Sequence, residues 1–130
     1  MFVQNLNPTQ QEILLKLADD LMLSDGVKDQ REEDLIRIIK SQCNADISSK
    51  KEFELSGLAN LFVSKKAKVS LLLELIGLAH ADGDYGKEEM AFINEIALLL
   101  NINSSDLSQL ESWVISLLDL MKVSVKLMEE

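Results

Sequence analysis

The sequence is poor in the residues that usually equip a protein for chemistry. Its 130 residues include one cysteine, one histidine, one proline, one tyrosine and one tryptophan. A single cysteine excludes an internal disulfide, and helical spacing from Ile36 and Ile39 predicts Cys43 to be a small buried side chain. One histidine and one cysteine cannot supply a typical zinc site. There is also no nucleophile elbow and no phosphate-binding loop, so we predict that the protein is not an enzyme.

Positive charge is also scarce. Lysine and arginine number 13 against 22 aspartates and glutamates, which gives a net charge of −9. Because nucleic acids are bound by clustered basic side chains, this balance argues against DNA or RNA as a partner and permits cations or basic proteins. The small basic cluster Lys65, Lys66 and Lys68 has no interleaved aromatic residue, and we interpret it as a solvated hinge.

Long uncharged apolar runs are missing as well. Glu74, Glu95 and Asp119 interrupt the best candidates before they reach the roughly 18 residues of a membrane helix. Residues 1–12 lack the basic start and apolar run of a signal peptide. We therefore expect a cytoplasmic protein without membrane insertion.

The residues that are abundant predict helices. Apolar residues make up 47% of the sequence and recur at helical spacing, whereas strand signals are weak. Asn7 and Pro8 are suited to cap and open a first helix that ends at Gly26, and a second helix begins near Asp29. Residues 44–46 interrupt the second helix. The six predicted helices carry the apolar positions Ile13 to Leu21, Leu35 to Cys43, Phe53 to Phe62, Leu71 to Ala79, Phe92 to Leu100 and Leu107 to Met121.

The later helices have their own boundary signals. Ser48 or Ser49 is expected to cap the third helix, residues 64–68 to form a turn into the fourth, and Ser105 to cap the sixth, whose tail frays. The fourth helix has Glu74 as its only charge and is apolar almost all round. We predict that it is the central and most buried element.

The sequence also superimposes on itself. A shift of 57 positions aligns about three helices without a gap, which indicates an internal duplication. The identical pairs include Asp25 and Asp82, Gly26 and Gly83, and Glu32 and Glu89. We therefore predict an all-α fold, a compact bundle of about six helices built from two pseudo-symmetric three-helix repeats at residues 8–62 and 64–120. One domain spans residues 1–130, because either repeat alone is too small to bury its apolar faces well.

Both repeats carry the pattern D-G-x-x-x-x-x-E at the end of an apolar helix. The second copy reads A-D-G-D-Y-G-K-E-E over residues 81–89, and the first has Ser24, Val27 and Arg31 at positions that differ from the usual pattern. From about Ile13 to Leu120 the sequence resembles the TerB-like family. That family is named for the tellurite-resistance protein TerB and is also found at the N-terminus of a membrane-anchored J-domain co-chaperone. The resemblance implies an all-helical, internally symmetric fold and a role in bacterial stress response or membrane-linked complexes.

The resemblance also implies a divalent-cation role for the acidic positions of both repeats. Ca²⁺ and Mg²⁺ prefer oxygen ligands, which the carboxylates of the second loop could supply. The spacing is not that of an EF-hand, since counting from Asp82 puts the glycine position on Lys87 and the bidentate glutamate position on Ile93. The candidate metal ligands are Asp25, Glu32, Asp82, Asp84 and Glu89.

A purely structural interpretation competes with the metal site. Gly83 can stop one helix, Gly86 can cap the next, and Glu89 follows at capping-box spacing. Caps need no ligand to explain them, so we favour this interpretation. We expect His80 to be a packed or surface residue rather than a metal ligand and Tyr85 to fold back over the helix ends.

Two functions therefore remain open. The first is a non-enzymatic, cation-responsive TerB-like domain in a stress or tellurite-resistance-type system. The second is a metal-free interaction or self-assembly module, with a protein partner or a homodimer. It is motivated by the last helix, where apolar residues from Trp113 to Met121 surround most of the circumference. Trp113 either faces a partner or, as we favour, is partly buried against the second repeat.

Overall fold

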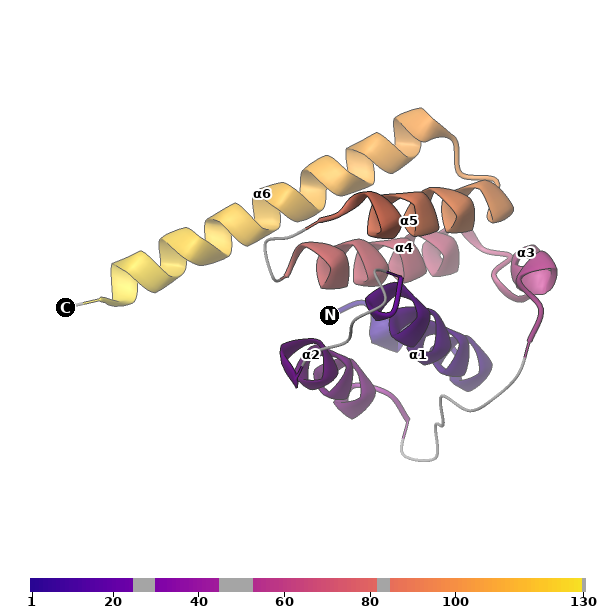
Figure 1. Ribbon diagram of the computed structural model, residues 1–130, viewed down its shortest axis with the longest axis horizontal. Coiled ribbons are helices and arrows are strands. Elements are labelled where there is room, and N and C mark those ends of the chain that lie inside the picture. The colour runs from indigo at the N-terminus through magenta and orange to yellow at the C-terminus, as the bar shows by residue number, and fades with distance from the viewer. Residues whose placement is uncertain (25–29, 45–52, 82–84, 130) are drawn as a thin grey trace.

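The computed structural model describes residues 1–24, 30–44, 53–81 and 85–129, without the side chains of Arg31 and Glu32. Throughout these ranges the regular elements are helices and there is no strand, which confirms the predicted all-α bundle of about six helices (Figure 1). The elements are η1 (Val3–Asn5), α1 (Pro8–Met22), α2 (Gln30–Ser41), η2 (Leu55–Gly57), α3 (Leu58–Leu61), α4 (Lys65–His80), α5 (Lys87–Leu99) and α6 (Ser104–Met128).

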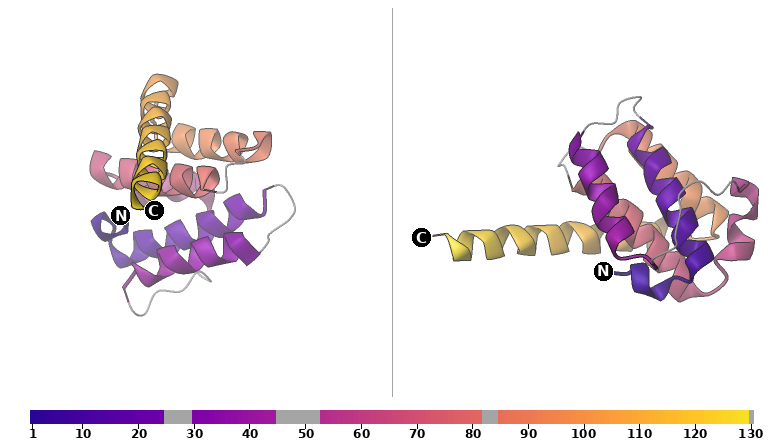
Figure 2. Two further views of the ribbon diagram at one scale, coloured as in Figure 1. Left: turned by 90° about the vertical axis from the view of Figure 1, so that its left-hand side faces the viewer. Right: turned by 90° about the horizontal axis from the view of Figure 1, so that it is seen from below.

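Helix α4 lies at the centre, as predicted. It packs against η1, α1, α5 and α6, which surround it on several sides (Figure 2). Its buried side chains face all of these neighbours, and Leu71, Leu72, Leu75 and Ile76 are fully buried. Because every neighbour covers part of its circumference, α4 is stable only as part of the assembled bundle.

Helix α1 begins as the sequence predicts. The Asn7 side chain accepts a hydrogen bond from the Gln10 amide at 2.8 Å, and the Gln10 side chain accepts one from the Asn7 amide at 2.9 Å. Pro8 occupies the first helical position, where its missing N–H costs nothing. The predicted stop at Gly26 lies outside the described residues. The predicted apolar stripe is buried and comprises Ile13, Leu14, Leu17, Ala18 and Leu21.

The N-terminal segment is part of the core, which we did not predict. Val3 and Leu6 are buried, and the Phe2 amide donates to Glu74 Oε1 of α4 at 2.7 Å. The buried Gln11 side chain donates to the carbonyls of Val3 and Leu6 and accepts from the Asn44 amide at 2.9 Å. One amide side chain therefore joins the N-terminal segment, α1 and the end of α2.

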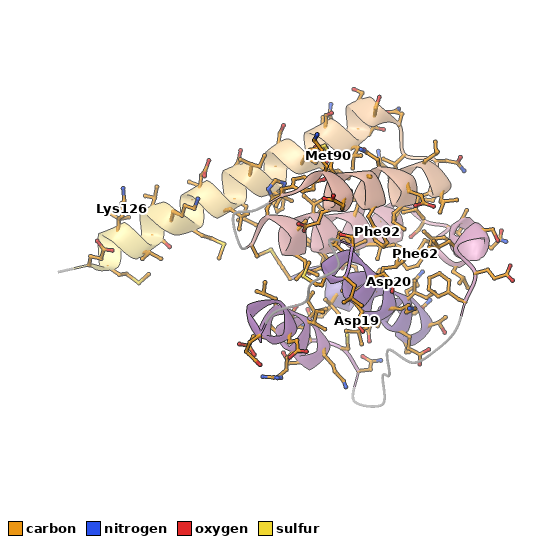
Figure 3. All side chains as sticks on the ribbon, in the orientation of Figure 1. Asp19, Asp20, Phe62, Met90, Phe92 and Lys126 are labelled. Carbon is orange, nitrogen blue, oxygen red and sulfur yellow. The ribbon has the colours of Figure 1, made fainter. Side chains whose placement is uncertain are left out.

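The second and third helices differ from the prediction. Of the expected buried face of α2, Ile39 is buried and Leu35 and Ile36 are half-buried, while Cys43 lies beyond the helix end at Ser41. The expected caps Ser48 and Ser49 lie outside the described residues. The described remainder of the third helix is η2 and the four-residue α3. Leu58 of α3 and Phe62, which directly follows α3 (Figure 3), belong to the core.

Two predicted helix starts were misplaced. The Ser64 hydroxyl accepts from the Ala67 amide at 3.1 Å, so α4 begins at Lys65 and residues 64–68 are not a turn. The basic cluster accordingly lies on the first two turns of α4 and not in a hinge. The Asn103 side chain accepts from the Asp106 amide at 2.8 Å, so Asn103 and not Ser105 caps α6.

Helix α6 is much longer than predicted. It runs for 25 residues to Met128 instead of fraying after Met121. Its first half lies on α4 and α5, and its second half extends beyond the other helices (Figures 1 and 2). Among the described residues, no helix combines the length and the apolar character needed to cross a membrane.

Candidate functional site

Three described residues at the second acidic loop come from α4, from α6 and from the segment just before α5. His80 ends α4, Tyr85 precedes α5, and Glu111 belongs to α6. The Tyr85 hydroxyl donates to Glu111 Oε1 at 3.2 Å, and the Tyr85 ring packs edge-on against His80 with ring centroids 4.2 Å apart. Tyr85 therefore folds back over the helix ends, as predicted, and connects the loop to α6.

Glu89 has a clear structural role at the start of α5. It is 9% exposed, and its Oε1 accepts from the Gly86 amide at 3.5 Å. Gly86 is the N-cap of α5, which confirms the predicted capping arrangement. The negative charge of Glu89 is also favourable at the positive end of the helix dipole.

The electrostatic environment of Tyr85 is negative. Burial raises the pKa of the Tyr85 hydroxyl above its ordinary value, and the Glu111 charge, the Glu111 hydrogen bond and the Glu89 charge raise it further. The phenol therefore stays neutral and acts as a hydrogen-bond donor at neutral pH. Such an arrangement attracts cations and does not produce a nucleophile.

Most of the candidate metal ligands cannot be placed. Asp25, Asp82 and Asp84 lie outside the described residues, and the Glu32 side chain is not described although its backbone belongs to α2. Glu89 is the candidate whose side chain is described. Within the described ranges, no three His, Cys, Asp or Glu side chains are arranged to hold a metal ion. The five-residue ligand set stays a prediction.

The donor chemistry nevertheless suits one class of ion. Glu89 and Glu111, from two helices, both bring a carboxylate charge to bear on Tyr85, which directly follows residues 82–84 in the sequence, and hard cations such as Ca²⁺ and Mg²⁺ prefer carboxylate oxygens. Sequence reasoning missed Glu111, because it lies 26 residues after Tyr85 and no local spacing links the two.

Trp113 and the nearby grooves are mainly apolar. Trp113 is 46% exposed and packs edge-on against Phe2 with ring centroids 5.7 Å apart, so its contact is with the N-terminal segment. One groove lies between Trp113 and the N-terminal segment, and a second lies between α2, α4 and α6. Among the described residues that line the second groove, Glu74 is the only carboxylate. The apolar lining of this groove includes Leu35, Ile38, Ile39, Leu78 and Met121. Among their described lining residues, both grooves have Glu74 as the single carboxylate.

Over the described residues the fold is an all-helical domain in which an apolar helix is followed in sequence by acidic residues, and the next helix opens with a capping glutamate. A family model described as tellurite resistance protein TerB matches residues 44–112, which is 69 of the 130 residues. The chain belongs to the TerB family, as the motif predicted. Searches of curated proteins and of solved structures find no significant match. The matched region contains the second acidic loop and ends just before Trp113.

Proposed function

We propose that this TerB-family chain is a non-enzymatic helical domain of a tellurite-resistance-type stress system that responds to a divalent cation at its second acidic loop. One observation carries the proposal: the hydroxyl of Tyr85, the residue directly after 82–84 in the sequence, donates to Glu111 of α6, and the charges of Glu111 and Glu89 both raise its pKa. Two carboxylates that act on one residue from separate helices produce a negative local potential, which favours binding of a cation.

The chain's own residues suggest how the response would reach the rest of the molecule. A bound Ca²⁺ or Mg²⁺ would supply positive charge, and Asp82, Asp84 and Glu89 would hold it through carboxylate oxygens. Asp25 and Glu32 are the matching positions of the first loop. Because the Tyr85 hydroxyl bonds Glu111 of α6, a change of charge in the loop would alter a contact between the loop and α6.

A metal titration tests this function. We expect Ca²⁺ or Mg²⁺ at millimolar concentration to shift the amide NMR signals of residues 81–89 and to lower the Tyr85 pKa, since positive charge favours the phenolate. Asp82→Ala should abolish both effects. The matched control Glu95→Ala removes an exposed carboxylate on α5 and should leave both effects intact. Loop signals that do not move at millimolar metal would contradict the proposal.

The two three-helix repeats are a further part of the proposal. They are supported by the helix bounds, because α4 begins 57 positions after α1. The side-chain caps Asn7 and Ser64 are related by the same offset. This is the shift that aligns the sequence with itself.

A second function, a protein-interaction or self-assembly module, is favoured by a different observation. The second half of α6 leaves the body of the molecule with large apolar side chains uncovered. Leu120, Val123 and Leu127 are 66%, 51% and 80% exposed. Exposed apolar side chains that gather on one element are typical of interaction sites.

A further inference from the structure

A regularly spaced row of mainly apolar side chains follows the outer face of α6. Trp113, Leu120 and Leu127 are spaced by seven residues, and Ser116 and Val123 follow the first two by three. Alternating steps of three and four are the spacing by which one helix packs along another. All five residues are exposed. We call these five residues the outer seam.

Apart from Trp113, which also packs against Phe2, the outer seam is separate from the face that α6 uses for its own fold. Leu107 and Val114 are buried against the body, at 5% and 3% exposed. With 3.6 residues per turn, the seam residues are rotated from this buried stripe by about 110–170° around the helix axis. From Ser116 to Leu127 the seam is therefore not required to hold α6 on the body and is open to a partner.

The charges beside the seam are self-complementary. Asp119 and Lys126 each directly precede a seam leucine, so both lie on the same flank. Both are exposed, and neither forms an ion pair with another described residue. In an antiparallel pair of identical helices this flank meets the same flank of the partner, where opposite charges attract.

We propose that a second copy of this chain docks on the outer seam, with the two α6 helices antiparallel. Leu120 of each copy packs against Val123 of the other, and Asp119 of each copy then lies beside Lys126 of the other. The partner identification rests on the interaction role proposed for α6. A parallel pair would set this flank against Leu117 and Ser124, which offer no charge, and would hold two bodies of the same net charge side by side.

The size of the contact predicts its strength. The overlapping helices span about 12 residues, or about 18 Å, and carry few large side chains per copy. Such a contact falls well below the roughly 1,200 Å² at which stable interfaces begin. We expect a weak dimer with a dissociation constant of about 0.1 mM.

Charge reversal tests the pairing. Sedimentation equilibrium of the full chain between about 10 µM and 1 mM should show a monomer–dimer equilibrium near the expected constant. Asp119→Lys and Lys126→Glu should each weaken association at least about tenfold, because like charges then meet.

The mixing experiment tests the pairing directly, because an equimolar mixture of the two variants should regain association. In each heterodimer the introduced lysine meets the introduced glutamate, and the native Asp119 of one chain meets the native Lys126 of the other. Glu95→Lys and Lys66→Glu change exposed body residues by the same charge and should leave wild-type association unchanged.

Several results would overturn the proposal. A chain that stays monomeric at 1 mM, or a dimer that resists both charge reversals, would do so, as would variants that fail to regain association when mixed. Capture of α6 by a different protein without self-association would overturn the second copy as partner but not the interaction role. Circular dichroism of each variant confirms that α6 is folded. The cation response is read from the NMR signals of the loop, so its failure is distinguishable from a failure to dimerise.

Discussion

Tyr85 is the residue at which the acidic loop contacts the rest of the bundle. Its hydroxyl donates to Glu111, and its ring packs against His80. Burial and two nearby carboxylates raise its pKa, so the neutral phenol is part of the folded state. Its hydrogen bond to a carboxylate contributes about 1–2 kcal/mol, toward the lower end because the site is only half-buried.

The raised pKa predicts a dependence of stability on alkaline pH. Above about pH 10 the unfolded chain loses the tyrosine proton while the folded chain keeps it, so the free energy of unfolding should fall as the pH rises further. The protein has one tyrosine, so its ultraviolet absorbance titration reports Tyr85 alone. Glu111→Gln should lower the Tyr85 pKa toward its ordinary value. Tyr85→Phe should remove this part of the pH dependence.

A control and a contrary result are available for the titration. Glu129→Gln removes a carboxylate on the far end of α6 and should leave the Tyr85 pKa unchanged. A wild-type tyrosine that titrates at its ordinary value, with no change in Glu111→Gln, would contradict the geometry.

At this scale, sequence reasoning succeeded where the interaction is local. The capping role of Glu89 follows from its spacing to Gly86. The position of Tyr85 between the end of one helix and the start of the next predicts that its ring packs over those ends. Glu111 could not be predicted, because its position depends on how α6 crosses the earlier helices. The placement of Asp82 and Asp84 stays a prediction.

Among the elements, the end of α5 shows how a single backbone conformation sets a chain direction. Asn101 has a φ of 60° and therefore lies in the left-handed region. Its amide donates to the Leu98 carbonyl at 3.1 Å, and the Ile102 amide donates to the Ala97 carbonyl at 2.9 Å. This is the Schellman arrangement, which stops α5 and directs the chain into α6.

Substitutions at Asn101 should follow from this conformation. Asn101→Val should destabilise the protein by about 1–2 kcal/mol, because a branched side chain is strained at positive φ. Asn101→Gly should be neutral or slightly stabilising. At the exposed Asn94 inside α5, the same change to glycine should instead cost up to about 0.5 kcal/mol. Urea denaturation measures all three, and equal effects of glycine at both positions would count against the left-handed conformation.

The errors in element boundaries have physical causes. Residues 103–105 are asparagine and two serines, all good caps, and only the hydrogen bond to Asp106 selects Asn103. Lysines in the first turn of α4 oppose the helix dipole, which made a turn plausible there. The cap from Ser64 and the burial of Ala67 against the core outweigh that penalty.

For the whole molecule, the position of α4 determines how the parts depend on one another. Four other elements pack on it, among them the N-terminal segment that sequence periodicity could not detect. The central place of α4 was predictable, because a helix that is apolar all round must be covered all round. The docking of residues 1–6 was not, because it depends on buried polar contacts from Gln11 and Glu74.

Truncation of a core side chain in α4 should therefore lower the stability of the whole bundle. Leu75→Ala should lower the free energy of unfolding by about 2–5 kcal/mol, because Leu75 is fully buried among several elements. The matched change Leu98→Ala removes a side chain that is 75% exposed on α5 and should cost less than about 0.5 kcal/mol. Trp113 fluorescence and far-ultraviolet circular dichroism should report one shared transition. Two separate transitions would show that the body does not unfold as one unit.

The length of α6 also governs how the molecule moves in solution. A helix of 25 residues is about 37 Å long, and only part of it lies on the body. A protruding helix of this kind increases hydrodynamic drag far more than it increases mass. Rotation of the molecule about the helix axis is therefore faster than rotation about an axis perpendicular to it. Amide bonds in α6 point along that axis and reorient only through the slower motion. A ligand that binds the protruding part of α6 would therefore alter the rotational diffusion of the molecule out of proportion to the ligand's own mass.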